Sequence, residues 1–125
     1  MEIIAHRGAS GVAPENTLAA IQQAIDFGAD SVEIDVRLSR DNEVYLMHDS
    51  KVNRTTSGSG HIRHLNSEII QKLDAGLWYD IKFQGEKVPT LSQVLNLCKG
   101  KVKLLIEVKS AERKRYPLLC QKISD

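Results

Sequence analysis

Two carboxylates lie two residues apart in a segment whose pattern is that of a β-strand. Residues 31–38 read SVEIDVRL, and this alternation of apolar and polar residues should place Glu33 and Asp35 on one face, about 7 Å apart. Residues 103–109 read KLLIEVK and present Glu107 in the same way. Neighbouring carboxylates repel unless a cation neutralises them, and an all-oxygen set suits a hard ion such as Mg²⁺ or Ca²⁺. We therefore predict a divalent-metal site at these three acids, the alternative being an exposed polar strand face neutralised by Arg37.

Two histidines close apolar segments that also read as strands. His6 ends residues 3–6 and His48 ends residues 43–48, and each shares the parity of neighbours that we expect to be buried. Each imidazole should therefore point inward. Beside a metal, one could take a proton from an attacking hydroxyl while the other donates a proton to a leaving alkoxide. The residues leave open which histidine is the base, and a histidine packed into a core or loop is the alternative for each.

Two cations accompany the acids. Arg7 follows His6 directly, and Lys109 follows Glu107 by two residues. Together with a metal they could bind an anionic phosphate, whereas ion pairs with the acids are the alternative reading. Acids, imidazoles and cations in combination indicate a phosphoester substrate. A glycosidase needs two carboxylates but would leave the histidines and cations without a role.

Strand-like and helix-like segments alternate along the chain. Residues 14–17 (PENT) open a helical pattern that Gly28 ends, residues 90–93 (TLSQ) fit a capping box, and residues 111–125 predict a further helix despite Pro117. Strand–helix alternation predicts an α/β fold with parallel strands, either doubly wound or a (β/α)8 TIM barrel. Four strand ends with polar residues, and no dinucleotide fingerprint after the first strand, favour the barrel. Residues 50–89 lose this pattern and predict a small insertion after the third strand.

The composition narrows the class of protein. The chain has 125 residues, of which 42% are hydrophobic and 26% charged, and its formal net charge is +1, as expected for one globular domain. This balance gives no electrostatic footprint for nucleic acid, and no apolar stretch approaches the roughly 18 residues that a membrane span needs. Cys98 and Cys120 have no metal-site or disulfide-framework spacing, so we expect reduced thiols. Because residues 3–5 already read as a strand rather than a leader, we expect a cytoplasmic protein.

Short motifs in the order HRG, PENT, EIDV, HD and IEVK resemble the glycerophosphodiester phosphodiesterase family over about residues 3–109. The resemblance implies a TIM barrel that hydrolyses glycerophosphodiesters to sn-glycerol 3-phosphate and an alcohol. It further implies attack of the glycerol 2-hydroxyl on phosphorus, followed by opening of a cyclic phosphate by water. The insertion at residues 50–89 resembles the small cap that family members carry beside the barrel mouth.

The resemblance also implies a role for each matching position. The metal ligands would be Glu33, Asp35 and Glu107, the acid and base His6 and His48, the phosphate contacts Arg7 and Lys109, and a support for the site Glu15.

The length departs from the family. A complete TIM barrel takes roughly 250 residues, and we count four strands here, so about half of the domain is present. Unpaired strands at both ends predict instability, aggregation or pairing of two copies into a homo-oligomer. A non-catalytic half-barrel that acts as an interaction or dimer-forming module is therefore the alternative function.

Overall fold

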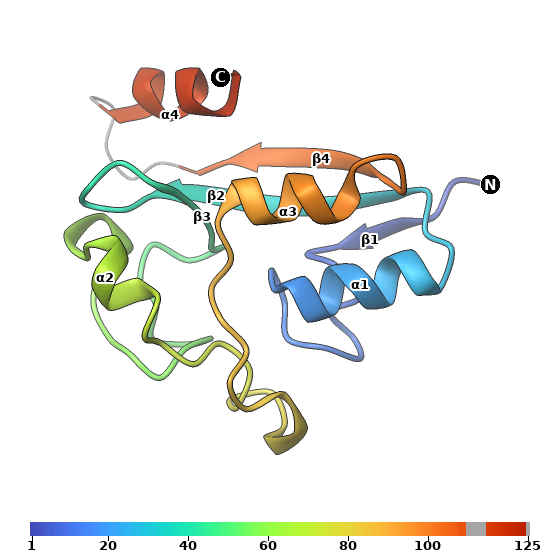
Figure 1. Ribbon diagram of the computed structural model, residues 1–125, viewed down its shortest axis with the longest axis horizontal. Coiled ribbons are helices and arrows are strands. Elements are labelled where there is room, and N and C mark those ends of the chain that lie inside the picture. The colour runs from blue at the N-terminus through green and yellow to red at the C-terminus, as the bar shows by residue number, and fades with distance from the viewer. Residues whose placement is uncertain (110–114, 125) are drawn as a thin grey trace.

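The computed structural model of the protein describes residues 1–109 and 115–124. Its centre is a four-stranded sheet in which β2 (Ser31–Leu38) pairs with each of the other strands (Figure 1). β1 (Ile4–His6) and β4 (Lys103–Val108) both run parallel to β2. The predicted α/β fold with parallel strands is confirmed for these three strands.

The third strand runs in the opposite direction from the one we predicted. β3 (Val44–Leu46) is antiparallel to β2, with Val36 opposite Leu46 and Leu38 opposite Val44. The connection between the two strands is a short turn at Asp41 and Asn42, which suits a hairpin, whereas a parallel pair needs a crossover of a dozen residues or more. The segment therefore returns along β2 instead of adding a barrel strand.

Helices cover one face of the sheet. α1 (Leu18–Asp26) and α3 (Leu91–Cys98) lie side by side over it, and α4 (Tyr116–Ser124) adds Leu119 to the same core (Figure 1). The apolar side chains of β2, Val32, Ile34 and Val36, are fully buried beneath these helices. Because side chains alternate along a strand, burial of this set turns Glu33 and Asp35 to the other face. The predicted helix after residue 111 is confirmed for residues 116–124, and residues 110–114 lie outside the described residues.

Both predicted helix starts are present. Thr17 caps α1 by accepting a hydrogen bond from the backbone N–H of Ala20, and Thr90 and Gln93 form the complete capping box of α3. Each cap satisfies backbone donors that the first helical turn leaves free. The helices therefore begin where the sequence indicates.

Residues 50–89 pack around a cluster of their own. Val52, Ile62, Ile70, Ala75 and Val88 are buried against Tyr45 and Met47, which belong to β3 and the residue that follows it. The segment contains three single-turn elements, η1 (Ile62–His64), α2 (Ser67–Ile70) and η2 (Ile81–Phe83).

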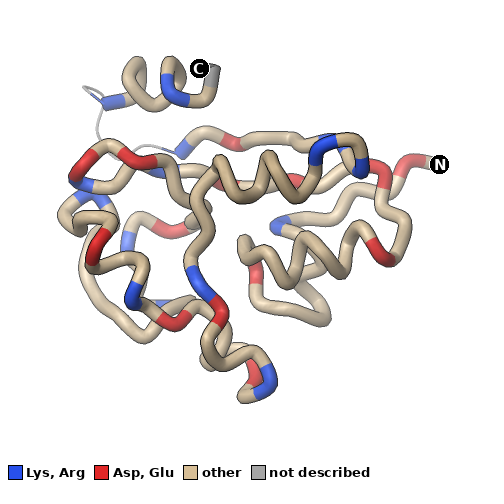
Figure 2. The backbone as a smooth tube through the Cα atoms, in the orientation of Figure 1, with Lys and Arg blue, Asp and Glu red and all other residues tan. Residues whose placement is uncertain are grey.

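Helix length and the distribution of charge bear on whether the chain could contact a membrane or a nucleic acid. None of the described helices is long and apolar enough to cross a membrane. Figure 2 shows basic and acidic positions interleaved along the described chain, in keeping with a net charge of +1.

The loop after β1 approaches α1 closely at Gly8. Arg7 and Gly8 both have left-handed backbone angles (φ 58° and 80°), and a Cβ atom on Gly8 would lie 2.8 Å from the backbone carbon and Cβ of Ala20. We predict that Gly8→Ala lowers the free energy of unfolding by about 2–4 kcal/mol, through backbone strain and overpacking. Urea denaturation measures this, with Gly11→Ala as the control because its added Cβ meets nothing within 4 Å. Equal stabilities of the two variants would contradict the prediction.

Candidate active site

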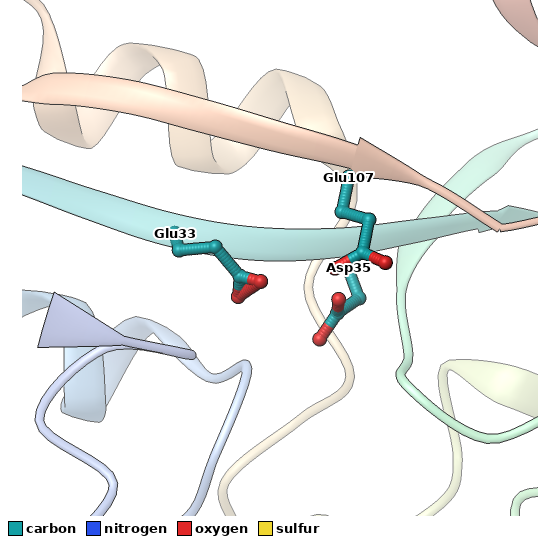
Figure 3. A group of neighbouring side chains, drawn as sticks. All are labelled: Glu33, Asp35 and Glu107. Atoms are coloured by element: carbon teal, nitrogen blue, oxygen red, sulfur yellow. The ribbon is translucent and has the colours of Figure 1, made fainter.

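Strand register brings the three predicted acids together. Asp35 of β2 is paired directly with Glu107 of β4, and Glu33 lies two residues before Asp35 on the same face of β2. All three carboxylates turn to one side of the sheet and toward one another (Figure 3). One oxygen from each lies within 4.8 Å of the others. The predicted cluster is therefore present in the structure.

The charges of this cluster are incompletely compensated. Burial, and next the neighbouring Asp35 carboxylate, raise the pKa of Glu33 above its ordinary value. Among the described residues, Glu33 Oε1 and Asp35 Oδ1 are buried without a hydrogen-bond partner. Oxygens up to about 5 Å apart can share one Ca²⁺, which lies about 2.3–2.6 Å from each ligand. The donor set and its unpaired oxygens thus fit a hard divalent cation.

Asn16 fixes the most buried acid, and the sequence analysis gave it no role. Its side-chain amide donates to Asp35 Oδ2 at 3.1 Å, and its carbonyl oxygen accepts from the Asp35 backbone N–H at 3.2 Å. Asn16 has a left-handed backbone (φ 55°) and is buried just before α1. Asn tolerates this conformation better than most residues, so the Asn within residues 14–17 (PENT) was the sequence signal for a left-handed turn at this position.

His6 adjoins the acids but is more exposed than we predicted. Its Nε2 lies 3.8 Å from Glu33 Oε2, because His6 is paired with Glu33 between β1 and β2. The side chain is 64% exposed, and Ile4 on the same face is 51% exposed. The expected burial of this face is wrong for the described residues, since the helices cover only the opposite face.

His48 is held at both its backbone and its ring. The guanidinium of Arg37 donates to the His48 carbonyl oxygen from Nε and Nη2, at 3.1 and 2.7 Å. The ring Nδ1 lies 2.8 Å from Asp49 Oδ1. Arg37 thus makes these hydrogen bonds to the segment that follows β3, and among the described residues none of its hydrogen bonds goes to the three acids.

The two predicted phosphate contacts are paired with acids. Lys109 Nζ lies 2.6 Å from Glu107 Oε1, and this hydrogen bond is the main cause of the lowered pKa of Glu107. Arg7 is held more loosely: Nη1 lies 3.4 Å from Glu15 Oε2, and Nε lies 3.5 Å from Asp35 Oδ2 without making a hydrogen bond. Both cations border the cluster, and these contacts are the ion pairs that the sequence left open as the alternative to phosphate binding.

Arg54 connects the rest of the site and was missed by the sequence analysis. It donates to both oxygens of Glu15, at 2.9 and 3.0 Å, and to both oxygens of Asp49, at 2.9 and 3.1 Å. Its hydrogen bonds are the largest cause that lowers the pKa of Asp49 to about 2. Arg54 lies in the segment without a clear strand or helix pattern, so its sequence context gave no sign of this position.

The three parallel strands, with helices on one face and polar groups at their ends, form part of a (β/α)8 TIM barrel. Comparison with known families matches residues 6–123 to the Glycerophosphoryl diester phosphodiesterase family, and the chain belongs to this family.

Individual relatives agree with the family match. A glycerophosphodiester phosphodiesterase of Caldanaerobacter subterraneus is 47% identical over 109 residues, which cover 86% of the chain and 45% of the relative. The crystal structure of a glycerophosphodiester phosphodiesterase from Agrobacterium tumefaciens matches with a TM-score of 0.88 and 40% identity, over 99% of the chain and 54% of that structure. An Oleispira antarctica phosphodiesterase, solved in complex with the product sn-glycerol-3-phosphate, matches with a TM-score of 0.85 and 41% identity, over 87% and 44%. The chain therefore spans about half the length of these relatives.

The depressed pKa of Asp49 predicts a pH-dependent contribution to stability. The folded state favours the ionised carboxylate, so the contribution is complete above about pH 4 and is lost as the pH falls through about 2. We expect Asp49→Asn to lower the free energy of unfolding by about 1 kcal/mol at pH 6, a value reduced for solvent screening. This difference from the wild type should shrink toward pH 2 in urea titrations.

Asp26→Asn, which removes an exposed acid of α1, is the control. A stability difference for Asp49→Asn that stays constant from pH 6 to pH 2 would contradict the role given to the Asp49 carboxylate.

Proposed function

We propose that this chain supplies the metal-binding and acid–base groups of a glycerophosphodiester phosphodiesterase, which releases sn-glycerol 3-phosphate and an alcohol. The convergence of Glu33, Asp35 and Glu107, with buried oxygens left unpaired, is the observation that carries the proposal. The His6 imidazole and two cations contact this cluster, and the His48 imidazole is linked to it through Asp49, Arg54, Glu15 and Arg7. This combination suits a phosphoester. Family membership and a relative solved with sn-glycerol-3-phosphate support the substrate class.

Glu33, Asp35 and Glu107 would hold the divalent ion, Mg²⁺ or Ca²⁺. A bound divalent ion would withdraw charge from a phosphate oxygen and acidify a coordinated hydroxyl. Asn16 keeps the Asp35 carboxylate turned into the cluster through its two hydrogen bonds. Asp35 is fully buried, and an ionised carboxylate in such a place needs a compensating charge.

The two histidines would transfer the protons. One accepts the proton of the attacking hydroxyl, and the other donates a proton to the leaving alkoxide oxygen. Since ionised Asp49 can only accept a hydrogen bond, it holds the proton of the neutral His48 ring on Nδ1. Nε2 is then the nitrogen of His48 that is available to exchange a proton.

Arg7 and Lys109 would bind the phosphate oxygens. Arg7 retains donors without good partners, because its Nε makes no hydrogen bond among the described residues. Lys109 would exchange part of its contact with Glu107 for the phosphate as a metal engages that carboxylate. The segment at residues 50–89 would act as a cap beside these groups. The cytoplasmic location of the protein stays a prediction from the sequence.

The open face of the sheet favours an additional possibility. Ile4 and Leu105, on the face that carries the acids, are 51% and 41% exposed. Apolar side chains on the inner face of a barrel are normally covered by the opposite strands. A second copy of the chain could cover them, which would make the chain a dimer-forming module, and analytical ultracentrifugation distinguishes this dimer from a monomer.

Activity is tested with the chain alone and with the chain extended by the C-terminal half of the Caldanaerobacter relative. We expect glycerol 3-phosphate to be released from glycerophosphocholine at least by the extended chain, in a reaction that requires Mg²⁺ or Ca²⁺. His48→Ala should lower kcat by about 10²–10⁴-fold, the usual contribution of a general acid or base. Extended chains that are folded yet inactive, or active regardless of metal and His48, would contradict the proposal.

Metal binding is tested separately on the 125-residue chain. We expect Mg²⁺ or Ca²⁺ at 100 times its dissociation constant to stabilise the fold by about 2.7 kcal/mol. Glu33→Gln should abolish this gain, measured as a shift of the thermal midpoint. Glu68→Gln, which alters an exposed glutamate paired only loosely with Lys72, is the matched control. An equal response to metal in Glu33→Gln would contradict the assignment.

A further inference from the structure

We propose that Arg54 is a positioning residue that orients His48 and at the same time keeps Arg7 available for phosphate, an inference that rests on the proposed function. Arg54 belongs to the segment at residues 50–89 rather than to the sheet. Its guanidinium stands between two acids, Asp49 beside His48 and Glu15 beside Arg7.

The geometry of Arg54 is a double fork. Nη1 and Nη2 donate to the two oxygens of Glu15, while Nε and Nη2 donate to the two oxygens of Asp49. Two-pronged contacts fix the plane of a carboxylate as well as its distance, and a lysine ammonium does not reproduce them. Arg54 therefore sets the orientation of both acids at once.

The backbone that carries Arg54 is well anchored. Val52 is fully buried, Thr55 is 7% exposed, and the Thr56 hydroxyl donates to the Val52 carbonyl oxygen at 2.7 Å. The same segment contacts the barrel again at Glu86, whose carboxylate accepts a hydrogen bond from the backbone N–H of Ala19 at 2.9 Å. These contacts hold the backbone near Arg54, and the hydrogen bonds to Glu15 and Asp49 hold its half-exposed side chain before substrate arrives, as a positioning role requires.

The contact with Asp49 determines the tautomer of His48. With both Asp49 oxygens held by Arg54, Oδ1 still lies 2.8 Å from His48 Nδ1. Arg37, a second charged group that contacts this histidine, binds its carbonyl oxygen rather than its ring. If Arg54 is lost, Asp49 is free to rotate, and the preference of the ring for a proton on Nδ1 weakens.

The contact with Glu15 determines how tightly Arg7 is bound. Glu15 accepts from Arg54 at 2.9 and 3.0 Å but from Arg7 only at 3.5 and 3.4 Å. Arg54 thus takes the strong hydrogen bonds of the carboxylate, and Arg7 is left loosely held. Without Arg54, Glu15 would pair with Arg7 directly and compete with phosphate for its guanidinium.

The His48 arm is tested by ¹⁵N NMR of the histidine rings in the 125-residue chain, at a pH where the rings are neutral. We expect His48 to carry its proton on Nδ1 in the wild type and in Lys72→Met, which removes an exposed cation of the same segment. In Arg54→Met the Nδ1–H fraction should fall by about half, and Arg54→Lys should restore it only in part. An unchanged tautomer in folded Arg54→Met would overturn the proposal that Arg54 orients His48.

The Arg7 arm is tested with inorganic phosphate as the probe, by calorimetric titration. Arg54→Met should weaken phosphate binding about threefold or more. Glu15→Gln should improve binding more in the Arg54→Met background than in the wild type, since only there does Glu15 hold Arg7 tightly. Equal effects of Glu15→Gln in the two backgrounds would overturn the proposal that Arg54 keeps Arg7 available for phosphate.

Both measurements are independent of turnover, so they separate this inference from the proposed function. A tautomer and a phosphate affinity that respond to Arg54 support the inference even if no diester is hydrolysed. If the diester is hydrolysed but neither the His48 tautomer nor the phosphate affinity changes when Arg54 is replaced, the proposed function is supported and the role given to Arg54 is wrong.

Discussion

Repulsion among Glu33, Asp35 and Glu107 is the constraint on which the rest of the site depends. β2 and β4 pair continuously from Ser31 opposite Lys103 to Val36 opposite Val108. A slip of one residue would expose the apolar side chains that now pack under α1 and α3, so the core enforces the register and the register enforces the cluster of acids. Burial, and next the charge of Asp35, raise the pKa of Glu33, so this position disfavours the ionised form of its carboxyl.

The acids are compensated by a chain of ion pairs in which basic and acidic side chains alternate. From the buried Asp35, contacts lead through Arg7, Glu15 and Arg54 to Asp49 and then to the ring of His48. Arg54 makes short, two-pronged hydrogen bonds to Asp49 and Glu15, whereas the contacts of Arg7 are longer. The network is therefore firm where a histidine must be oriented and loose where an anion is proposed to bind.

The predictable parts of this protein are those in which local pattern and tertiary structure agree. The alternation of residues 31–38 defined the central strand and its polar face, and residues 90–93 defined a capping box that the structure contains. The direction of β3 was predicted wrongly because an apolar run does not distinguish a hairpin strand from a barrel strand. Asn16 and Arg54 were missed because Asn16 binds Asp35, 19 residues away, and Arg54 links Asp49 to Glu15, which lies 39 residues from it.

The chain belongs to the glycerophosphoryl diester phosphodiesterase family and spans about half the length of its relatives, yet it already brings the acids together. The most direct test of that cluster is a crystal structure of the chain grown with Mn²⁺, using anomalous scattering to locate the ion. We expect one strong peak within coordination distance of oxygens from Glu33, Asp35 and Glu107. A well-ordered cluster without a peak, or a peak only at other side chains, would contradict it.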